Sequence, residues 1–226
     1  MSNQLLMKQV MLQQTPFLKI DEYHFKVLEK RYNVSLDWSV EQIDAWYHEA
    51  LNHLFEEMVS LGLPESLIEP LFIKHFKMHQ ATSLDETVDQ HILETFQGPY
   101  EHAALEVYSK MVLDFYRLNK FLRFNQIDEV VAEGYLAIDD FKHYQDVDRL
   151  VLNSLYYKSL ENLTVDNFEG KTTLALHSGL RDFIWGLKVK ESLFALVYFK
   201  IVELKNVRAF LKATRYGFNP KEFIYV

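Results

Sequence analysis

The chain contains no cysteine among its 226 residues. This absence excludes disulfide bonds and thiolate metal sites, and nothing in the composition argues for an oxidising compartment. Glycine and proline are also scarce, with seven and five residues, whereas 17 Phe and 13 Tyr contribute to a hydrophobic content of 49%. Few chain breakers favour long regular elements, and this much apolar surface is enough for a sizeable core. We therefore expect a folded protein made mainly of helices.

Long uninterrupted apolar runs are missing as well. A membrane-spanning helix needs about 18 or more apolar residues, whereas the best window, 193–202, contains Lys200 and is followed by Glu203. The segment 1–14 lacks the apolar run of a signal peptide, because Lys8 and several Gln interrupt it. A net charge of −8 opposes general attraction to nucleic-acid phosphates and anionic lipids. The sequence predicts a cytoplasmic protein with no transmembrane segment and no nucleic-acid partner.

Apolar residues recur at helical spacing through most of the chain, and no strand-like alternation is sustained. A capping box of Ser39 and Gln42 marks the clearest helix start. The fold class predicted from this pattern is all-α, a multi-helix bundle or funnel of similar helical units. The expected helices cover residues 40–61, a segment from 64 onward that contains Pro70, 83–96, 100–125, 140–160, 173–188 and 191–216.

The dipeptide Gly98-Pro99 is the best internal boundary, because both residues disfavour a continuing helix. It suggests an N-terminal helical region over 1–98 and a C-terminal helical region over 99–226. A single continuous domain is the alternative.

The last predicted helix carries charge where its neighbours are apolar. Glu203, Asn206 and Arg208 interrupt a stripe of leucine, isoleucine and valine side chains, and a buried charge must be paired or hydrogen-bonded. Asn206 lies beside Glu203 on the helix, whereas Arg208, five residues on, faces elsewhere and would seek an acid on another helix. Two compatible interpretations follow: an internal strut that fixes helix register, and a surface that grips a partner.

The end of this predicted helix, and the start of another helix after it, can be recognised in the sequence. Gly217 and the basic residues before it suit a helix C-terminus. Asn219, Pro220 and Glu222 then have the spacing of a capping box that begins a further short helix.

The apolar and aromatic run with Tyr198, followed by Glu203-x-x-Asn206-x-Arg208, Gly217 and Glu222, resembles the end of the C subunit of V/A-type rotary ATPases, called subunit d in the eukaryotic vacuolar enzyme. The resemblance covers residues 190–224, and loosely 105–226. It implies an all-helical funnel of three similar units that sits on the membrane rotor ring and receives the central shaft. It also implies that the chain has no catalytic centre and no cofactor.

The resemblance further implies a related helix in each unit, rich in asparagine and arginine. Asp114, Asn119 and Arg123 are the weaker counterpart in this chain, although Asn119 and Arg123 are four residues apart and Asn206 and Arg208 only two. The chain is shorter than is usual for the family, so one unit is expected to be missing or heavily reduced. Residues 1–98 match nothing in the family.

A search for catalytic motifs finds little. There is no glycine-rich phosphate loop, no His-Glu-x-x-His pair and no Gly-x-Ser-x-Gly elbow, and the neighbouring His177 and Ser178 are interpreted as a helix-surface feature. Histidines form the one metal-like constellation, but neither His53 nor His79 has Glu three residues before it, as di-iron bundles require. We interpret them as polar faces of amphipathic helices, so that no metal is expected; the four histidines are His48, His53, His75 and His79.

The function predicted from these observations is a non-catalytic central-stalk subunit of a proton- or sodium-translocating V/A-type ATPase. Its partners would be the central shaft subunits and the membrane rotor ring, and it would be peripheral to the membrane through protein contacts. Glu203, Asn206 and Arg208 would contact a partner or form a structural polar network. The alternative is a free-standing all-helical scaffold or adaptor, and a third class is a metal-dependent helical enzyme.

Overall fold

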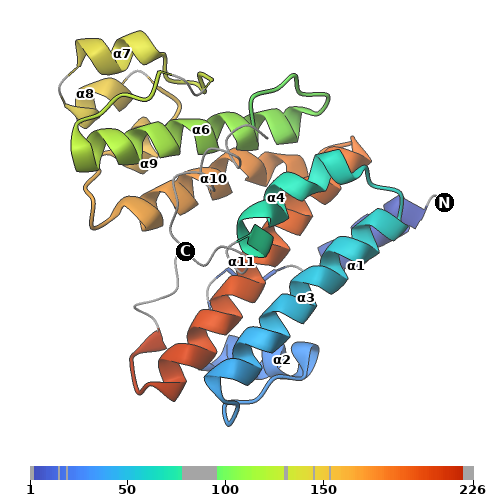
Figure 1. Ribbon diagram of the computed structural model, residues 1–226. Coiled ribbons are helices and arrows are strands. Elements are labelled where there is room, and N and C mark those ends of the chain that lie inside the picture. Colours follow the sequence, from blue (N-terminus) through green and yellow to red (C-terminus); the bar gives the residue numbers. More distant parts are fainter. Residues whose placement is uncertain are drawn as a thin grey trace. The chain divides into compact units, whose positions relative to one another are not determined.

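The computed structural model describes residues 3–14, 16–18, 20–77, 96–129, 132–144, 146–152 and 154–220, except for the side chains of 74–77. These residues form ten helices and no strand (Figure 1), so the all-α prediction is confirmed. The helices are α1 (Asn3–Gln13), α2 (Glu22–Tyr32), α3 (Val40–Ser60), α4 (Glu65–Lys77), α6 (Ala103–Phe124), α7 (Ile138–His143), α8 (Val147–Val151), α9 (Tyr157–Leu160), α10 (Phe168–Ile184) and α11 (Val189–Arg215).

The helices pack into two compact units. The first contains Met1–Ile68 and Leu187–Val226, and the second contains Glu69–Gly186, so the division falls within α4. This grouping differs from the division at residue 98 that the Gly-Pro break suggests. The difference arises because α11, near the end of the sequence, packs on α1 and α3 at its beginning.

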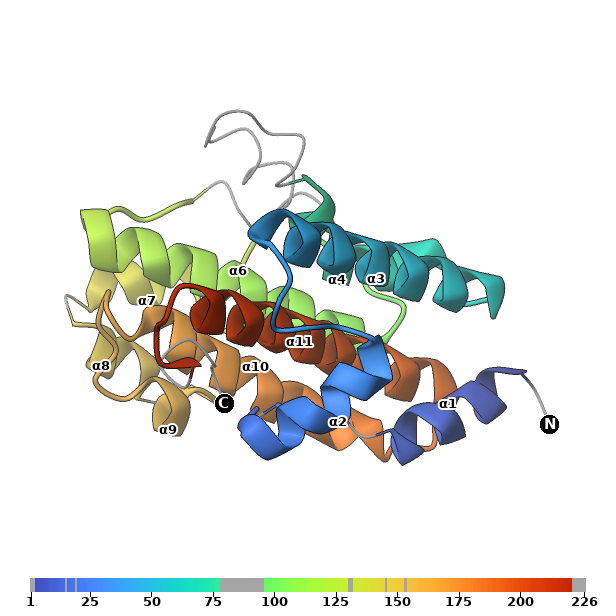
Figure 2. The same cartoon turned by 90° about the horizontal axis from the view of Figure 1, so that it is seen from below.

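The first unit is built around α11. Figure 2 shows α3 on one side of this helix and α1 and α2 on the other. The packing is aromatic in part: the ring of Phe25 on α2 stacks on Phe210 of α11 with centroids 4.5 Å apart. α3 begins with the predicted capping box, in which the side chains of Ser39 and Gln42 each bond the other's backbone N–H. Eighteen of the 27 residues of α11 are buried, which explains its nearly continuous apolar sequence.

In the second unit α6 and α10 lie side by side (Figure 1). α6 ends at Asn125, whose backbone is left-handed, with φ of 52°. The single helix predicted over 140–160 is wrong, because this segment contains three short helices, α7, α8 and α9. Asp146 begins α8 by accepting a hydrogen bond from the backbone N–H of Asp148, which favours a new helix over continuation of the previous one.

The other predictions have mixed outcomes. Helices α3, α4, α6, α10 and α11 lie on predicted segments, whereas α1 and α2 were not predicted. The helix predicted over 83–96 lies outside the described residues except for Phe96. The short final helix predicted to begin at Pro220 also lies outside them, apart from that first residue. Among the described helices none is long and apolar enough to cross a membrane.

Candidate functional site

The most concentrated polar cluster of the first unit surrounds Glu203 on α11, whose side chain is fully buried. Its carboxylate accepts hydrogen bonds from the Arg31 guanidinium at 3.1 Å and from the Lys200 ammonium at 3.1 Å. The hydroxyl of Tyr32 and the backbone N–H of Phe17 also donate to it. Four donors therefore converge on one carboxylate, which offsets the cost of burying its charge.

Burial and charge set the protonation of the donors around Glu203. Burial raises the pKa of Tyr32 far above its usual value, and the adjacent carboxylate of Glu203 raises it further. Burial lowers the pKa of Lys200, whereas the charge and hydrogen bond of Glu203 oppose that shift. Tyr32 consequently remains a hydrogen-bond donor at any physiological pH. The cluster acts as a fixed set of donors around the carboxylate of Glu203.

Asn206 and Arg208 extend the polar contacts of α11 in two directions. The Asn206 amide donates to the backbone carbonyl of Leu18 at 2.8 Å. Arg208 bonds Asp44 on α3 at 2.7 Å, and Lys212 bonds the same carboxylate at 2.7 Å. Although burial opposes the effect, hydrogen bonds from Lys212 and Arg208 lower the pKa of Asp44. From its position on the helix, Arg208 was expected to pair with an acid on another helix, and Asp44 on α3 is such an acid.

The second unit has its own buried carboxylate, Asp114 on α6. It accepts hydrogen bonds from the hydroxyl of Tyr156 at 2.6 Å and from the backbone N–H groups of Tyr135 at 2.7 Å and Leu136 at 3.2 Å. Burial raises the pKa of Asp114 to about 6, although these three hydrogen bonds and the charge of Arg117 oppose the shift.

Arg117, three residues beyond Asp114, is also completely buried. Its guanidinium donates to the backbone carbonyls of Asp128 at 2.9 Å and Ala132 at 3.2 Å. Gly134 packs so closely against α6 that an added Cβ would lie 2.2 Å from the carboxylate of Asp114. Asp114 and Arg117 together hold the segment that follows α6 against the helix, one through its N–H groups and the other through its carbonyls.

The two units share this arrangement. In each unit, a buried acid on the central helix accepts hydrogen bonds from a tyrosine hydroxyl and from a backbone N–H of a segment that crosses the helix. Three residues later on the same helix, a second side chain donates to a backbone carbonyl of that crossing segment. Residues three apart lie on one helix face, so the pair satisfies both polar groups of a chain that crosses the helix. The pairs are Glu203 with Asn206, and Asp114 with Arg117. We call each pair, with the segment it holds, an acid–donor clamp.

Asn119 and Arg123, named from the sequence as counterparts of Asn206 and Arg208, lie elsewhere. The guanidinium of Arg123 donates to the Asn119 side chain at 2.7 Å in an exposed pair on α6. Within the described residues this pair does not join the cluster around Asp114. The sequence missed Arg117, although a signal was present: it lies three residues after Asp114 and four before Phe121, on the apolar face of the helix.

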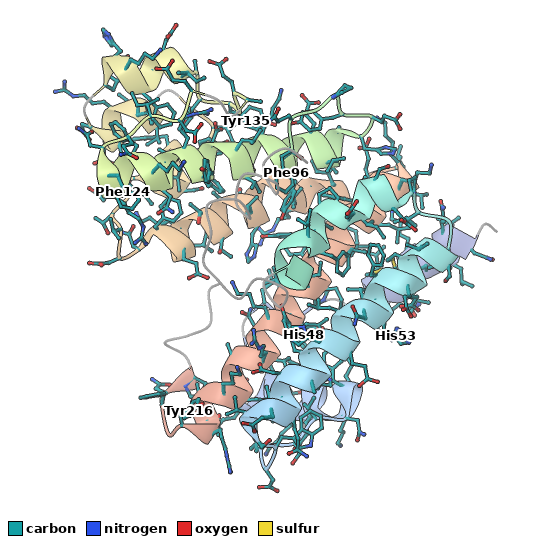
Figure 3. The ribbon with its side chains drawn as sticks, viewed as in Figure 1. His48, His53, Phe96, Phe124, Tyr135 and Tyr216 are labelled. Atoms are coloured by element: carbon teal, nitrogen blue, oxygen red, sulfur yellow. The ribbon has the colours of Figure 1, made fainter. Side chains whose placement is uncertain are left out.

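The histidines do not assemble into a metal site in the part of the chain that the structure describes. His48 and His53 are labelled on α3 in Figure 3. They are five residues apart, so their directions differ by about 140° around the helix. His79 and the side chain of His75 lie outside the described residues.

The pair of His177 and Ser178 was predicted to lie on a helix surface, which is wrong for the histidine. His177 is buried in α10, whereas Ser178 is exposed. Burial lowers the pKa of His177 to about 4, and the positive charge of Arg181 lowers it in the same direction. The two side chains leave the helix in different directions, so this geometry does not make a nucleophile and its base.

The fold and the two clamps define an all-α protein of two helical units, each organised around a buried carboxylate on a long helix. No family model, curated protein or solved structure matches the chain.

Proposed function

We propose that this protein is a non-catalytic central-stalk subunit that couples the soluble rotor shaft to the membrane rotor ring of a proton- or sodium-translocating V/A-type ATPase. The observation that carries the proposal is the repeated acid–donor clamp. The resemblance of residues 190–224 implies a protein of similar helical units with related polar helices. Two units with the same carboxylate arrangement, one of them centred on the residues of the resemblance, support that reading.

In this role the subunit transmits torque through its shape, and its interior has to keep helix register under load. Buried hydrogen-bonded charges suit this task, because removing one partner of such a pair costs about 3–5 kcal/mol. Slippage of α11 by one residue would break the contacts of Glu203, Asn206 and Arg208 together. The protein would be cytoplasmic and would reach the membrane only through its contacts with the ring and the shaft, without binding a nucleotide.

A free-standing helical scaffold or adaptor is the second candidate. It accounts equally well for residues 1–98, which the resemblance does not reach. The observation that favours it is an aromatic groove along α3, described in the next subsection.

Affinity purification of the tagged protein from its native membranes, followed by mass spectrometry, tests the proposal. We expect rotor-ring and central-shaft subunits to co-purify. If none of them is recovered from a preparation in which the ATPase itself is intact, the coupling role is wrong and the adaptor is the better account.

A charge swap separates a partner contact of Arg208 from its internal role. Arg208→Glu removes the ion pair with Asp44 and should impair assembly under both interpretations. In the double variant Asp44→Arg/Arg208→Glu the internal pair is restored with reversed polarity, and the new acid also lies four residues from Lys212. If Arg208 grips a partner, the double variant folds but still fails to assemble. Restored assembly assigns Arg208 to the internal strut alone.

A further inference from the structure

The first unit has a surface groove that the buried clamp does not account for. It follows α3 and has a volume of about 540 Å³. One wall comes from the end of α2 and the α2–α3 connection, and the floor is α3 itself. The residues that matter to the argument are Tyr32, Trp38, Ala45, Trp46, Glu49 and Ala50.

Three aromatic rings line this groove, Tyr32 and Trp38 on the wall and Trp46 on the floor. The rings of Trp38 and Trp46 are tilted by 54° with centroids 6.4 Å apart, and Tyr32 meets Trp46 edge to face at 5.8 Å. Both tryptophans are half-buried. Neither indole N–H donates to another group in the described part of the chain. An indole combines a large apolar ring with one N–H donor, and both half-buried tryptophans line the groove, so they suit a ligand with apolar groups and carbonyl acceptors.

The floor of the groove suits an extended chain. It runs along α3 from Gln42 to His53, which corresponds to about 16 Å at 1.5 Å per residue. Ala45 and Ala50 on the floor have short side chains that permit close approach of a backbone. A polyproline II segment advances about 3.1 Å per residue, so five or six residues of such a segment fill this length.

Among the described residues, the groove is lined by one acidic side chain and by no Lys or Arg. The acidic side chain is Glu49, whose carboxylate forms no ion pair in the part of the chain that the structure describes. The whole chain carries a net charge of −8. A ligand with a positive charge beside its apolar part therefore complements the groove.

The clamp of the first unit fixes one wall of the groove in advance. The hydroxyl of Tyr32 donates to Glu203, and the ammonium of Lys200 lies 4.7 Å from the Tyr32 ring centroid. A wall held in this way loses little conformational entropy when a ligand binds. The clamp and the groove are thus physically connected through a single side chain.

We propose that this groove binds an extended, proline-rich segment of a partner protein that carries an arginine or lysine beside its prolines. Proline rings pack on the faces of Tyr32, Trp38 and Trp46, the two indole N–H groups donate to peptide carbonyls, and Glu49 pairs with the basic residue. Aromatic-lined grooves recognise such segments because the polyproline conformation is already formed before binding. The inference does not depend on the rotary-ATPase role, since either a coupling subunit or an adaptor can use the groove.

The test follows the three indole N–H signals of the ¹⁵N-labelled protein by NMR. The probe is a hexaproline peptide that ends in arginine, and the control peptide ends in glutamate. We expect the Trp38 and Trp46 signals to shift saturably with the arginine peptide and the Trp185 signal to stay in place. Trp185 is a matched internal control, because it is 70% exposed and belongs to the second unit.

Variants make the assignment specific. Trp38→Ala and Glu49→Lys should each weaken binding about tenfold or more, the size expected for a central interface residue, whereas Trp185→Ala should not. If Trp38→Ala does not fold, as judged by circular dichroism, Trp38→Phe removes only the indole N–H and part of the ring. The proposal is overturned if no saturable shift occurs up to about 1 mM peptide. Equal shifts of all three indoles overturn it too, as does equal binding of a proline-free peptide with the same charge, because either shows a non-specific surface.

Discussion

Arg208 on α11 and Asp44 on α3 form an ion pair with a nitrogen–oxygen distance of 2.7 Å, although 164 residues separate them in the sequence. The guanidinium of Arg208 also lies 4.8 Å from the ring centroid of Tyr47, one helical turn further along α3. The two charged side chains are about one third exposed, at 32% and 31%. Such a pair contributes about 1 kcal/mol or less, so its main effect is to set how α11 aligns with α3.

Reversing one charge of this pair tests that alignment. We expect Arg208→Glu to lower the free energy of unfolding by about 1–2 kcal/mol, because two carboxylates then face each other beside α11. The double variant Asp44→Arg/Arg208→Glu should recover most of the loss. Urea unfolding followed by circular dichroism measures both values. A double variant as unstable as the single one would mean that the geometry of the native pair, and not its charge, is what matters.

Protein stability should be far more sensitive to loss of Glu203 than to loss of Glu191, the other acid of the same helix. Glu203→Gln leaves the partly buried Arg31 and Lys200 facing a neutral side chain, and we expect a loss of about 3 kcal/mol or more. Glu191→Gln is the matched control, since Glu191 also lies on α11 but, among the described residues, forms an ion pair only with Lys188, which is 77% exposed. That control should lose less than about 1 kcal/mol. Similar losses in the two variants, measured by thermal or urea unfolding, would contradict the importance assigned to the clamp.

The raised pKa of Asp114 predicts a particular pH dependence of stability. The carboxyl has a pKa of about 6 in the folded protein against a usual value of 3.8, so between these values the folded state holds more protons than the unfolded state. The contribution of Asp114 to the free energy of unfolding is therefore fully present below about pH 4 and is lost as the pH rises through 6. The loss is at most about 3 kcal/mol.

Asp114→Asn isolates that contribution, because an amide cannot titrate but can still accept the backbone N–H groups. We expect the stability of the wild type relative to this variant to fall as the pH rises from about 4 to about 7. Urea unfolding across this range provides the comparison. A difference that stays constant with pH, or that grows as the pH rises, would show that the hydrogen bonds outweigh burial and that the folded pKa is not raised.

Gly134 is predicted to be essential to the clamp of the second unit. A Cβ at this position would lie 2.2 Å from the Asp114 carboxylate and 2.3 Å from the Lys110 carbonyl. We expect Gly134→Ala to cost about 2–3 kcal/mol, since both close contacts are to groups on the rigid helix α6.

Gly217→Ala provides a contrast with a different physical cause. Its φ is +73° and an added Cβ would meet no atom within 4 Å, so only backbone strain of about 1 kcal/mol is expected. Thermal unfolding of the two variants tests the distinction between crowding and strain. A smaller loss for Gly134→Ala than for Gly217→Ala would show that the segment after α6 shifts freely.

Local sequence signals predicted the long helices well and the short ones badly. α3 was predictable because Ser39 and Gln42 form a complete capping box before a periodic apolar stripe. The segment 140–160 was not, because Phe141, Leu150 and Leu160 reach the core from three short helices whose turns the apolar pattern does not reveal. α2 was missed although it begins at a good N-cap, Asp21, and ends at Asn33 in the left-handed conformation.

The sequence by itself determined that the chain is helical, that α11 is buried, and that its charged residues need partners. These follow from composition, helical periodicity and the cost of an unpaired buried charge, all of which are local properties. Only the tertiary structure decided which partners those are. Arg31, Tyr32 and Phe17 reach Glu203 from the start of the chain, and Asp44 reaches Arg208 from α3. Such pairings depend on how helices distant in sequence cross, and no periodicity within one helix contains that information.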